Sequence, residues 1–339
     1  MFELKEGASF EPQRFPPLEP HALSNRIVER SRLVDTLKTQ RKLLSEYPFI
    51  QSRAFYRTAQ AEGYSKLAPG YMTKIDKDLP AWSKDAQTHL YKVLYLASFG
   101  GVGVVSDMSA AALWGLPKFT SWPKKVQRVN RKGTACSQTK MGRVRSTSVP
   151  IDLLQVGGLE VTSVAQTVVD IARLGSIFDA VVAGDAALHD GLCTMDQLSE
   201  VLESHRNCVG IRKARGTIRL LDIGSESPGE TMVRLRLIDS GFKIPLTQLG
   251  IGVGGKTYFA DLAYLETGVI IEFDGWLKYD PKTNGGASMS DADRREHLRE
   301  RDLRAAGLTI HRITWADIQT RAAFQAWLRR EKPNFPQAK

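Results

Sequence analysis

The segment Tyr258-Phe259-Ala260-Asp261-Leu262-Ala263-Tyr264 predicts an apolar strand that carries one acid, and Val269-Ile270-Ile271-Glu272-Phe273-Asp274-Gly275 predicts a second strand that ends in two. Side chains alternate along a strand, so Glu272 and Asp274 share a face. Only four residues, Leu265 to Gly268, connect the strands, which favours an antiparallel pair. This pairing brings Asp261 beside Glu272.

Acids in apolar strands are costly unless they are paired or bind a metal. Two converging carboxylates, with a backbone carbonyl between them, would form an oxygen-rich site for a hard cation such as Mg²⁺ or Mn²⁺. A second interpretation is structural: Asp261 and Glu272 pair with nearby arginines or lie at solvated strand ends. The residues alone leave both interpretations open.

The two strands belong to a predicted module of about 110 residues that follows a Gly-, Ser- and Pro-containing boundary at Asp222 to Pro228. Its expected order is α-β-β-β-α-β-α. The ranges are helix Gly229–Ile238, strands Leu246–Val253, Thr257–Tyr264 and Val269–Asp274, loop Asp280–Asp291, helix Ala292–Ala306, strand Leu308–Ile313, and a last helix capped by Thr314.

Several motifs of this module resemble those of a known nuclease fold. They are Asp261, Glu272-x-Asp274-Gly275, Ser227-Pro228-Gly229-Glu230, Arg301-Asp302-Leu303-Arg304-Ala305-Ala306-Gly307 and His311-Arg312-Ile313-Thr314-Trp315. Together they resemble the restriction-endonuclease-like PD-(D/E)xK fold, and more closely the branch related to very-short-patch-repair endonucleases. The resemblance covers roughly Ser225 to Arg330.

This resemblance implies a metal-dependent DNA endonuclease, with a context in DNA repair or phage defence. Asp261, Glu272 and the Phe273 carbonyl would bind Mg²⁺ or Mn²⁺, and Glu230 would bind the metal or its water. The family's usual lysine, two residues after the Glu, is replaced by Asp274, and the nearest lysine is Lys278. The implied catalytic set is therefore Glu230, Asp261, Glu272, Asp274 and Lys278.

Positive charge is concentrated upstream of this module. The chain has 47 Lys+Arg against 37 Asp+Glu, a net charge of +10, and two segments, Pro117 to Thr147 and Ser204 to Leu221, contain no acid. Clustered cations attract a polyanion, since each neutralised phosphate releases counterions. The expected DNA-binding residues are Lys118, Lys124, Lys125, Arg128, Arg131, Lys132, Arg143, Arg145, Arg212, Lys213 and Arg215.

The upstream part carries a second resemblance. The motifs at 105–117 and 161–170 are similar to actinobacterial proteins with an abortive-infection type IV antitoxin-like region, which implies a winged helix, DNA binding and a toxin–antitoxin context. Leu67-Ala68-Pro69-Gly70-Tyr71 predicts a turn between two strands after a short helix. Residues 1–22, with four prolines, predict a flexible arm, 23–222 the basic helical and winged-helix region, and 223–332 the nuclease-like domain.

The fold class expected from these elements is α/β (α+β), with a mixed sheet in the C-terminal domain. Three scattered cysteines favour a reducing cytoplasm, and no segment predicts a membrane span. The sequence predicts DNA as partner and no small-molecule cofactor, and it is compatible with a homo-oligomer. The alternative to a nuclease is a non-catalytic DNA-binding regulator or antitoxin with a degenerate nuclease fold, which the missing lysine favours.

Overall fold

The computed structural model describes residues 2–16, 19–46, 51–99, 103–130, 136–275 and 291–338. The chain divides into two compact units: a terminal unit, formed by Met1–Pro17 with Asp222–Lys339, and a central unit, Leu18–Leu221. Both units contain helices and sheets, so the predicted mixed α/β class is confirmed. Within the described ranges, no helix has the length and apolar character needed to cross a membrane.

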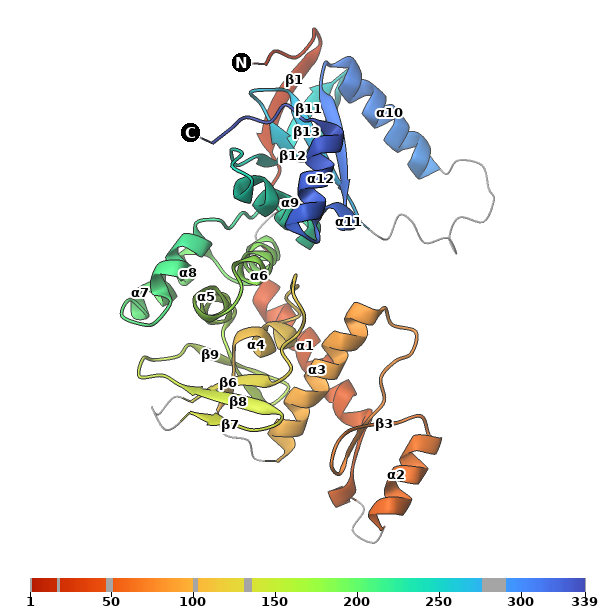
Figure 1. Cartoon of the computed structure of the whole chain (residues 1–339), viewed down its shortest axis with the longest axis vertical. Helices are drawn as coiled ribbons and strands as arrows, with labels where there is room; N and C mark the ends of the chain where they lie inside the picture. Colours follow the sequence, from red (N-terminus) through yellow and green to blue (C-terminus); the bar gives the residue numbers. More distant parts are fainter. Residues whose placement is uncertain are drawn as a thin grey trace. The chain divides into compact units, whose positions relative to one another are not determined.

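The terminal unit is built on a five-stranded sheet with the order β1-β11-β12-β13-β14. Figure 1 labels β1, β11, β12 and β13 of this sheet. Its strands are β1 (Ala8–Gln13), β11 (Leu246–Val253), β12 (Lys256–Tyr264), β13 (Val269–Asp274) and β14 (Thr309–Thr314). The pairs β1–β11, β11–β12 and β12–β13 are antiparallel, whereas β13 and β14 run parallel. The sheet is therefore mixed. From α9 (Pro228–Asp239) onward, helices and strands follow one another along the chain in the predicted order α-β-β-β-α-β-α.

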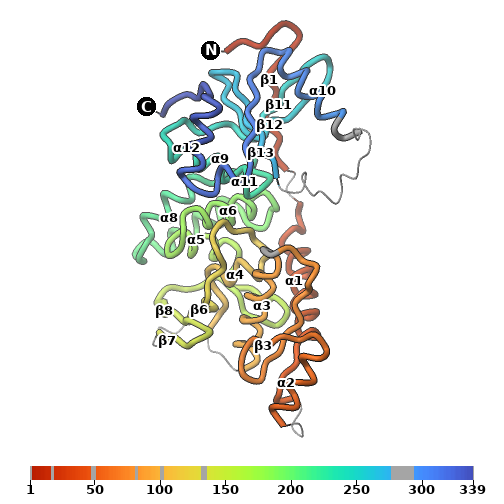
Figure 2. Tube along the Cα trace, turned by 45° about the vertical axis from the view of Figure 1, so that its right-hand side comes forward, coloured from red at the N-terminus to blue at the C-terminus, as the bar shows by residue number. Residues whose placement is uncertain are grey.

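Strand β1 corrects the prediction of a flexible arm over residues 1–22. It pairs with β11 from Ala8 opposite Val253 to Gln13 opposite Leu249, and Figure 2 shows it beside β11 although the two lie far apart in sequence. Pro12 coincides with a shift in register between Glu11 and Gln13. A proline is tolerated there because β1 is an edge strand, whose backbone does not need every N–H for pairing.

Among the described residues, four helices accompany this sheet: α9 (Pro228–Asp239), α10 (Asp291–Ala305), α11 (Trp315–Ile318) and α12 (Arg321–Glu331). Leu303 of α10 packs with Ile270 and Ile310 in the core, so α10 covers the face to which Ile270, Glu272 and Asp274 belong. On the other face, the rings of Phe273 and Trp315 meet edge to face at 5.2 Å.

A glycine sets how closely α9 approaches the sheet. A Cβ atom at Gly229 would lie 2.0 Å from the ring of Phe273, so only glycine allows this contact. Ser227 caps α9, and its side chain accepts a hydrogen bond from the Glu230 N–H. The cap and the close contact together hold Glu230 next to β13.

The central unit begins with α1 (Ala22–Thr39), β2 (Arg41–Leu43), a 3₁₀ turn at Leu44–Glu46, α2 (Ser52–Ala61), β3 (Ser65–Ala68) and β4 (Tyr71–Thr73). The strands form a small sheet with the order β2-β4-β3. The predicted short helix followed by a hairpin at Pro69-Gly70 is thus confirmed. Phe55, Ala59 and Met72 form the buried core beneath it.

The rest of the central unit contains a six-stranded mixed sheet with the order β7-β8-β6-β5-β10-β9. Its strands are β5 (Val104–Val105), β6 (Val126–Asn130), β7 (Ser137–Gln138), β8 (Gly142–Ser146), β9 (Leu153–Val156) and β10 (Leu159–Thr162). The helices are α3 (Ala81–Ser98), α4 (Asp107–Trp114), α5 (Val164–Leu174), α6 (Ile177–His189), α7 (Met195–Ser204) and α8 (Ile211–Ile218).

Candidate functional site

The predicted acids meet where two strands of the terminal unit separate. The pairing between β12 and β13 runs from Tyr264 opposite Val269 to Leu262 opposite Ile271, and the strands are antiparallel as predicted. One residue further on, the Asp261 carboxylate accepts a hydrogen bond from the backbone N–H of Phe273, with Oδ2 at 2.8 Å from the nitrogen. Asp261 therefore lies at the predicted position beside the Glu272–Phe273 peptide.

Glu230 is fixed at the start of α9 by hydrogen bonds to both of its carboxylate oxygens. The hydroxyl of Ser227 donates to Oε1 at 2.7 Å, and the backbone N–H of Glu226 donates to Oε2 at 2.9 Å. Burial raises the pKa of Glu230 to about 7, and the negative charge of Asp261 contributes to this rise. At neutral pH this carboxyl group can both hold and release a proton.

Glu272 has an even stronger bias toward its neutral form. Its side chain is buried, and desolvation together with the charge of Asp261 raises the pKa of Glu272 to about 8. Because Asp261 acts on both Glu230 and Glu272, the three acids form one electrostatic group. We call Glu230, Asp261 and Glu272 the acid group.

Two arginines outside the predicted set also lie at this site. Arg299 of α10 donates from Nη2 to Glu272 Oε1 at 2.6 Å and to the Phe259 carbonyl at 2.9 Å. Arg312 of β14 donates from Nη1 to Asp274 Oδ1 at 3.3 Å. The structural interpretation left open by the sequence, acids paired with arginines, is therefore observed for Glu272. Asp274, predicted as part of the catalytic set, is likewise ion-paired.

The donor chemistry of the site suits a divalent cation held by few protein ligands. Among the described residues, no three His, Cys, Asp or Glu side chains are placed to hold one metal ion. Mg²⁺, however, keeps several waters and commonly takes only one or two carboxylates. Asp261, Glu272 and the Phe273 carbonyl match that mode. Burial, with the charge of Asp261 as a second cause, raises the pKa values of Glu230 and Glu272.

Lys278, the predicted replacement for the missing lysine, lies outside the described residues, as do Arg131 and Lys132. The other predicted DNA-binding residues all belong to the central unit. Lys124, Arg143, Arg212 and Arg215 are exposed, and Lys118, Lys125 and Lys213 are half-buried. Three of these seven have internal partners: Lys118 lies over the Trp122 ring, Lys213 donates to the Gly175 carbonyl, and Arg215 pairs with Glu203.

Arg128 and Arg145 require a correction, because neither is available at the surface to contact phosphates. Arg128 is 8% exposed, and burial lowers its pKa. Arg145 is ion-paired with Asp107, at 3.3 Å, and with the fully buried Asp170. β6 and β8, the strands that carry Arg128 and Arg145, are interior strands of the sheet. The charge of Arg145 neutralises the buried acids Asp107 and Asp170 of its own unit.

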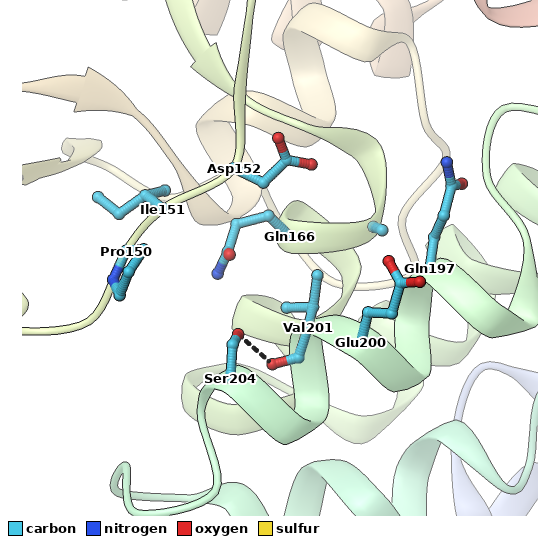
Figure 3. A pocket seen from close by; sticks show the side chains of 9 residues that line it. Pro150, Ile151, Asp152, Gln166, Gln197, Glu200, Val201 and Ser204 are labelled. Carbon is cyan, nitrogen blue, oxygen red and sulfur yellow. Dashed lines mark hydrogen bonds between the residues drawn. The ribbon is translucent and has the colours of Figure 1, made fainter.

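A shallow pocket of the central unit was not predicted (Figure 3). Its lining includes the acids Asp152 and Glu200 and the amides Gln166 and Gln197, and no basic side chain is among the described residues that line it. Gln166 Nε2 also donates a hydrogen bond to Oδ2 of Asp170, which is not one of the lining residues, at 3.1 Å. The lining of the pocket includes acids and amides, so its chemistry is unlike that of a phosphate-binding site.

Comparisons with known proteins give relatives without an assigned activity. No protein family model matches the chain. Two Mycobacterium tuberculosis proteins, "Uncharacterized protein MT2308" of strain CDC 1551 / Oshkosh and "Uncharacterized protein Rv2248" of strain ATCC 25618 / H37Rv, are each 31% identical to it over 123 residues. The match covers 36% of this chain and 45% of each relative, so the chain spans about half the length of these relatives. A crystal structure of the RV2827C protein from Mycobacterium tuberculosis is similar at 14% identity and a TM-score of 0.33, over 67% of this chain and 84% of that one.

Proposed function

We propose that the terminal unit is a metal-dependent deoxyribonuclease of the PD-(D/E)xK type, which hydrolyses phosphodiester bonds. The observation that carries this proposal is the acid group at the diverging ends of β12 and β13. Burial raises the pKa values of Glu230 and Glu272, the charge of Asp261 adds to the rise, and the Asp261 carboxylate accepts a hydrogen bond from the Phe273 N–H. Such a grouping is unfavourable for folding alone, which supports a role in binding a cation.

In this proposal Asp261, Glu272 and the Phe273 carbonyl hold Mg²⁺ or Mn²⁺. A divalent ion bound there supplies a water of lowered pKa and a positive charge next to the scissile phosphate. Glu230, with a pKa of about 7, accepts a proton near neutral pH. Asp261 orients the peptide between Glu272 and Phe273 through its hydrogen bond to the Phe273 N–H.

DNA is the proposed substrate because the central unit carries exposed and half-buried cations that lie close in its sheet or sequence. Arg143 lies on β8 next to β6, and Lys124 and Lys125 precede β6. Cations of this kind bind the phosphate backbone without reading sequence. A cytoplasmic setting agrees with this substrate.

The test is incubation of the full chain with supercoiled plasmid and with single-stranded DNA, in Mg²⁺, in Mn²⁺ and in excess chelator. We expect nicking or linearisation that requires the metal and is abolished in Glu272→Gln. Absence of cleavage of either DNA form in both metals would contradict the proposal.

The second candidate is a non-catalytic DNA-binding regulator or antitoxin. The ion pairs of Glu272 with Arg299 and of Asp274 with Arg312 favour it, since they satisfy acids without a metal. A protein that binds DNA but cuts neither substrate, and that binds no Mn²⁺, would be this regulator.

A further inference from the structure

The guanidinium of Arg299 joins three elements at the acid group, namely α10, β12 and β13. Arg299 of α10 donates to the Glu272 carboxylate on β13 at 2.6 Å, to the Phe259 carbonyl on β12 at 2.9 Å and to Glu296 on its own helix at 3.3 Å. Its side chain is 17% exposed. Arg299 therefore spans the gap at which β12 and β13 separate.

Helix stability alone does not explain these contacts. A surface pair between Arg299 and Glu296, three residues apart, would support α10 without either strand. Instead, the guanidinium is turned toward a buried carboxylate and a main-chain oxygen. A buried pair costs desolvation that its attraction often only balances, so it is a weak source of stability.

Arg299 contacts β13, a strand that carries no basic residue of its own. Glu272 and Asp274 share the face of β13 that α10 covers, and position 274 carries a second negative charge. Arg312 pairs with Asp274 and is also bound to Glu296 and Glu300, so its charge is divided among three acids. Arg299 is thus a cation in direct contact with the acid group.

We infer that Arg299 is a positioning residue of this site, a fixed internal cation that orients Glu272 and supplies the positive charge that position 274 lacks. The inference rests on the proposed nuclease function. Two consequences of opposite sign follow. Arg299 repels a divalent metal directly, but it also lowers the pKa of Glu272 and so favours the carboxylate form that binds the metal. The same cation fixes the geometry and charge of the site, so it speeds turnover.

The experiment compares the full-length wild type with Arg299→Gln, Arg299→Lys and the control Arg304→Gln. Arg304 lies on the same helix, is 52% exposed and pairs with Glu300. Mn²⁺ affinity is measured by calorimetry, kcat and KM by plasmid nicking, and folding by Tm. For Arg299→Gln the two effects on the metal oppose each other, so we expect Mn²⁺ affinity to change by no more than about 3-fold, kcat to fall about 10²-fold and KM to change little.

Arg299→Lys keeps the charge but cannot donate in the same forked geometry. We expect its Mn²⁺ affinity to stay near that of the wild type and its kcat to recover about tenfold over Arg299→Gln. This variant keeps the test valid if Arg299→Gln fails to fold. Arg304→Gln should match the wild type in all measurements.

The outcomes separate this inference from the function on which it rests. If Arg299→Gln nicks at the wild-type rate, or if Mn²⁺ binding weakens together with kcat and Tm, Arg299 has a structural role only and the inference is wrong. A wild-type protein that cuts no DNA would instead overturn the proposed function itself, and this inference with it.

Discussion

The Asp261 carboxylate accepts a hydrogen bond from the Phe273 backbone N–H at 2.8 Å, one residue beyond the last pair of the β12–β13 ladder. A side chain thus takes over a bond that sheet pairing would otherwise make. Buried N–H groups need a partner, so this bond allows the strands to separate. The separation is what leaves the Glu272–Phe273 peptide beside the Asp261 carboxylate.

Replacing Asp261 by asparagine should keep this hydrogen bond and remove only the charge. Burial raises the pKa values of Glu230 and Glu272, and the charge of Asp261 adds to the rise, so removing that charge relieves repulsion. We expect the Tm of Asp261→Asn at pH 8 to equal or exceed that of the wild type, while Mn²⁺ affinity falls at least about 10-fold. Scanning calorimetry and Mn²⁺ titration check this, with Asp239→Asn on α9 as control. A large drop in Tm would mean that Asp261 has a purely structural role.

The pH dependence of stability should carry the signature of Glu230 and Glu272. Their pKa values in the folded chain, about 7 and about 8, lie above the ordinary 4.5. A raised carboxyl pKa stabilises the fold fully below the ordinary value, and that contribution disappears as pH rises through the folded value. Metal-free protein should therefore become less stable between about pH 5 and 8, and Glu230→Gln should flatten this decline. Denaturant unfolding at several pH values tests this, and a rise in stability over that window would refute it.

Three cations of the central unit, the exposed Lys124 and Arg143 and the half-buried Lys125, should determine the salt dependence of DNA binding. Lys124→Gln, Lys125→Gln and Arg143→Gln, combined, should lower the slope of log K against log salt by about 0.9 for each phosphate that the protein no longer neutralises. Arg321→Gln, an exposed site of the terminal unit, is the control. Fluorescence anisotropy at several salt concentrations measures the slope. A slope identical to that of the wild type would assign these residues to another partner.

Arg145→Gln should destabilise the central unit and should not be a simple DNA-binding variant. It leaves Asp107 without its ion pair and removes one of the two arginine partners of the buried Asp170. Removing one partner of a buried pair costs about 3–5 kcal/mol. Arg143→Gln, on the same strand but exposed, should cost about 0.5 kcal/mol or less. Urea unfolding compares them, and equal stabilities would place Arg145 at the surface.

The sequence could predict the two acid-bearing strands because strand alternation and a four-residue connection leave little freedom. It could not predict β1, since Ala8–Gln13 reads as a polar, proline-containing segment and its partner β11 lies more than 200 residues later. Non-local pairing of an edge strand leaves almost no local signal.

The arginines illustrate a second limit. A count of charges cannot distinguish exposed Arg143 from Arg145, two residues later, because the difference lies in which acids are buried nearby. Asp107 and Asp170 in apolar segments were the available signal, since buried acids need a cation. For Arg299, the helix was predicted but its rotation about its axis was not, and that rotation directs the side chain to Glu272.

The most direct test of the proposed function is cleavage of supercoiled plasmid by the full chain in Mn²⁺, with the wild type and Asp261→Asn assayed side by side. The proposal predicts metal-dependent nicking by the wild type and a rate at least about 10²-fold lower for a folded Asp261→Asn. Equal rates for the two proteins, or no nicking by a wild type that binds the same DNA, would contradict it.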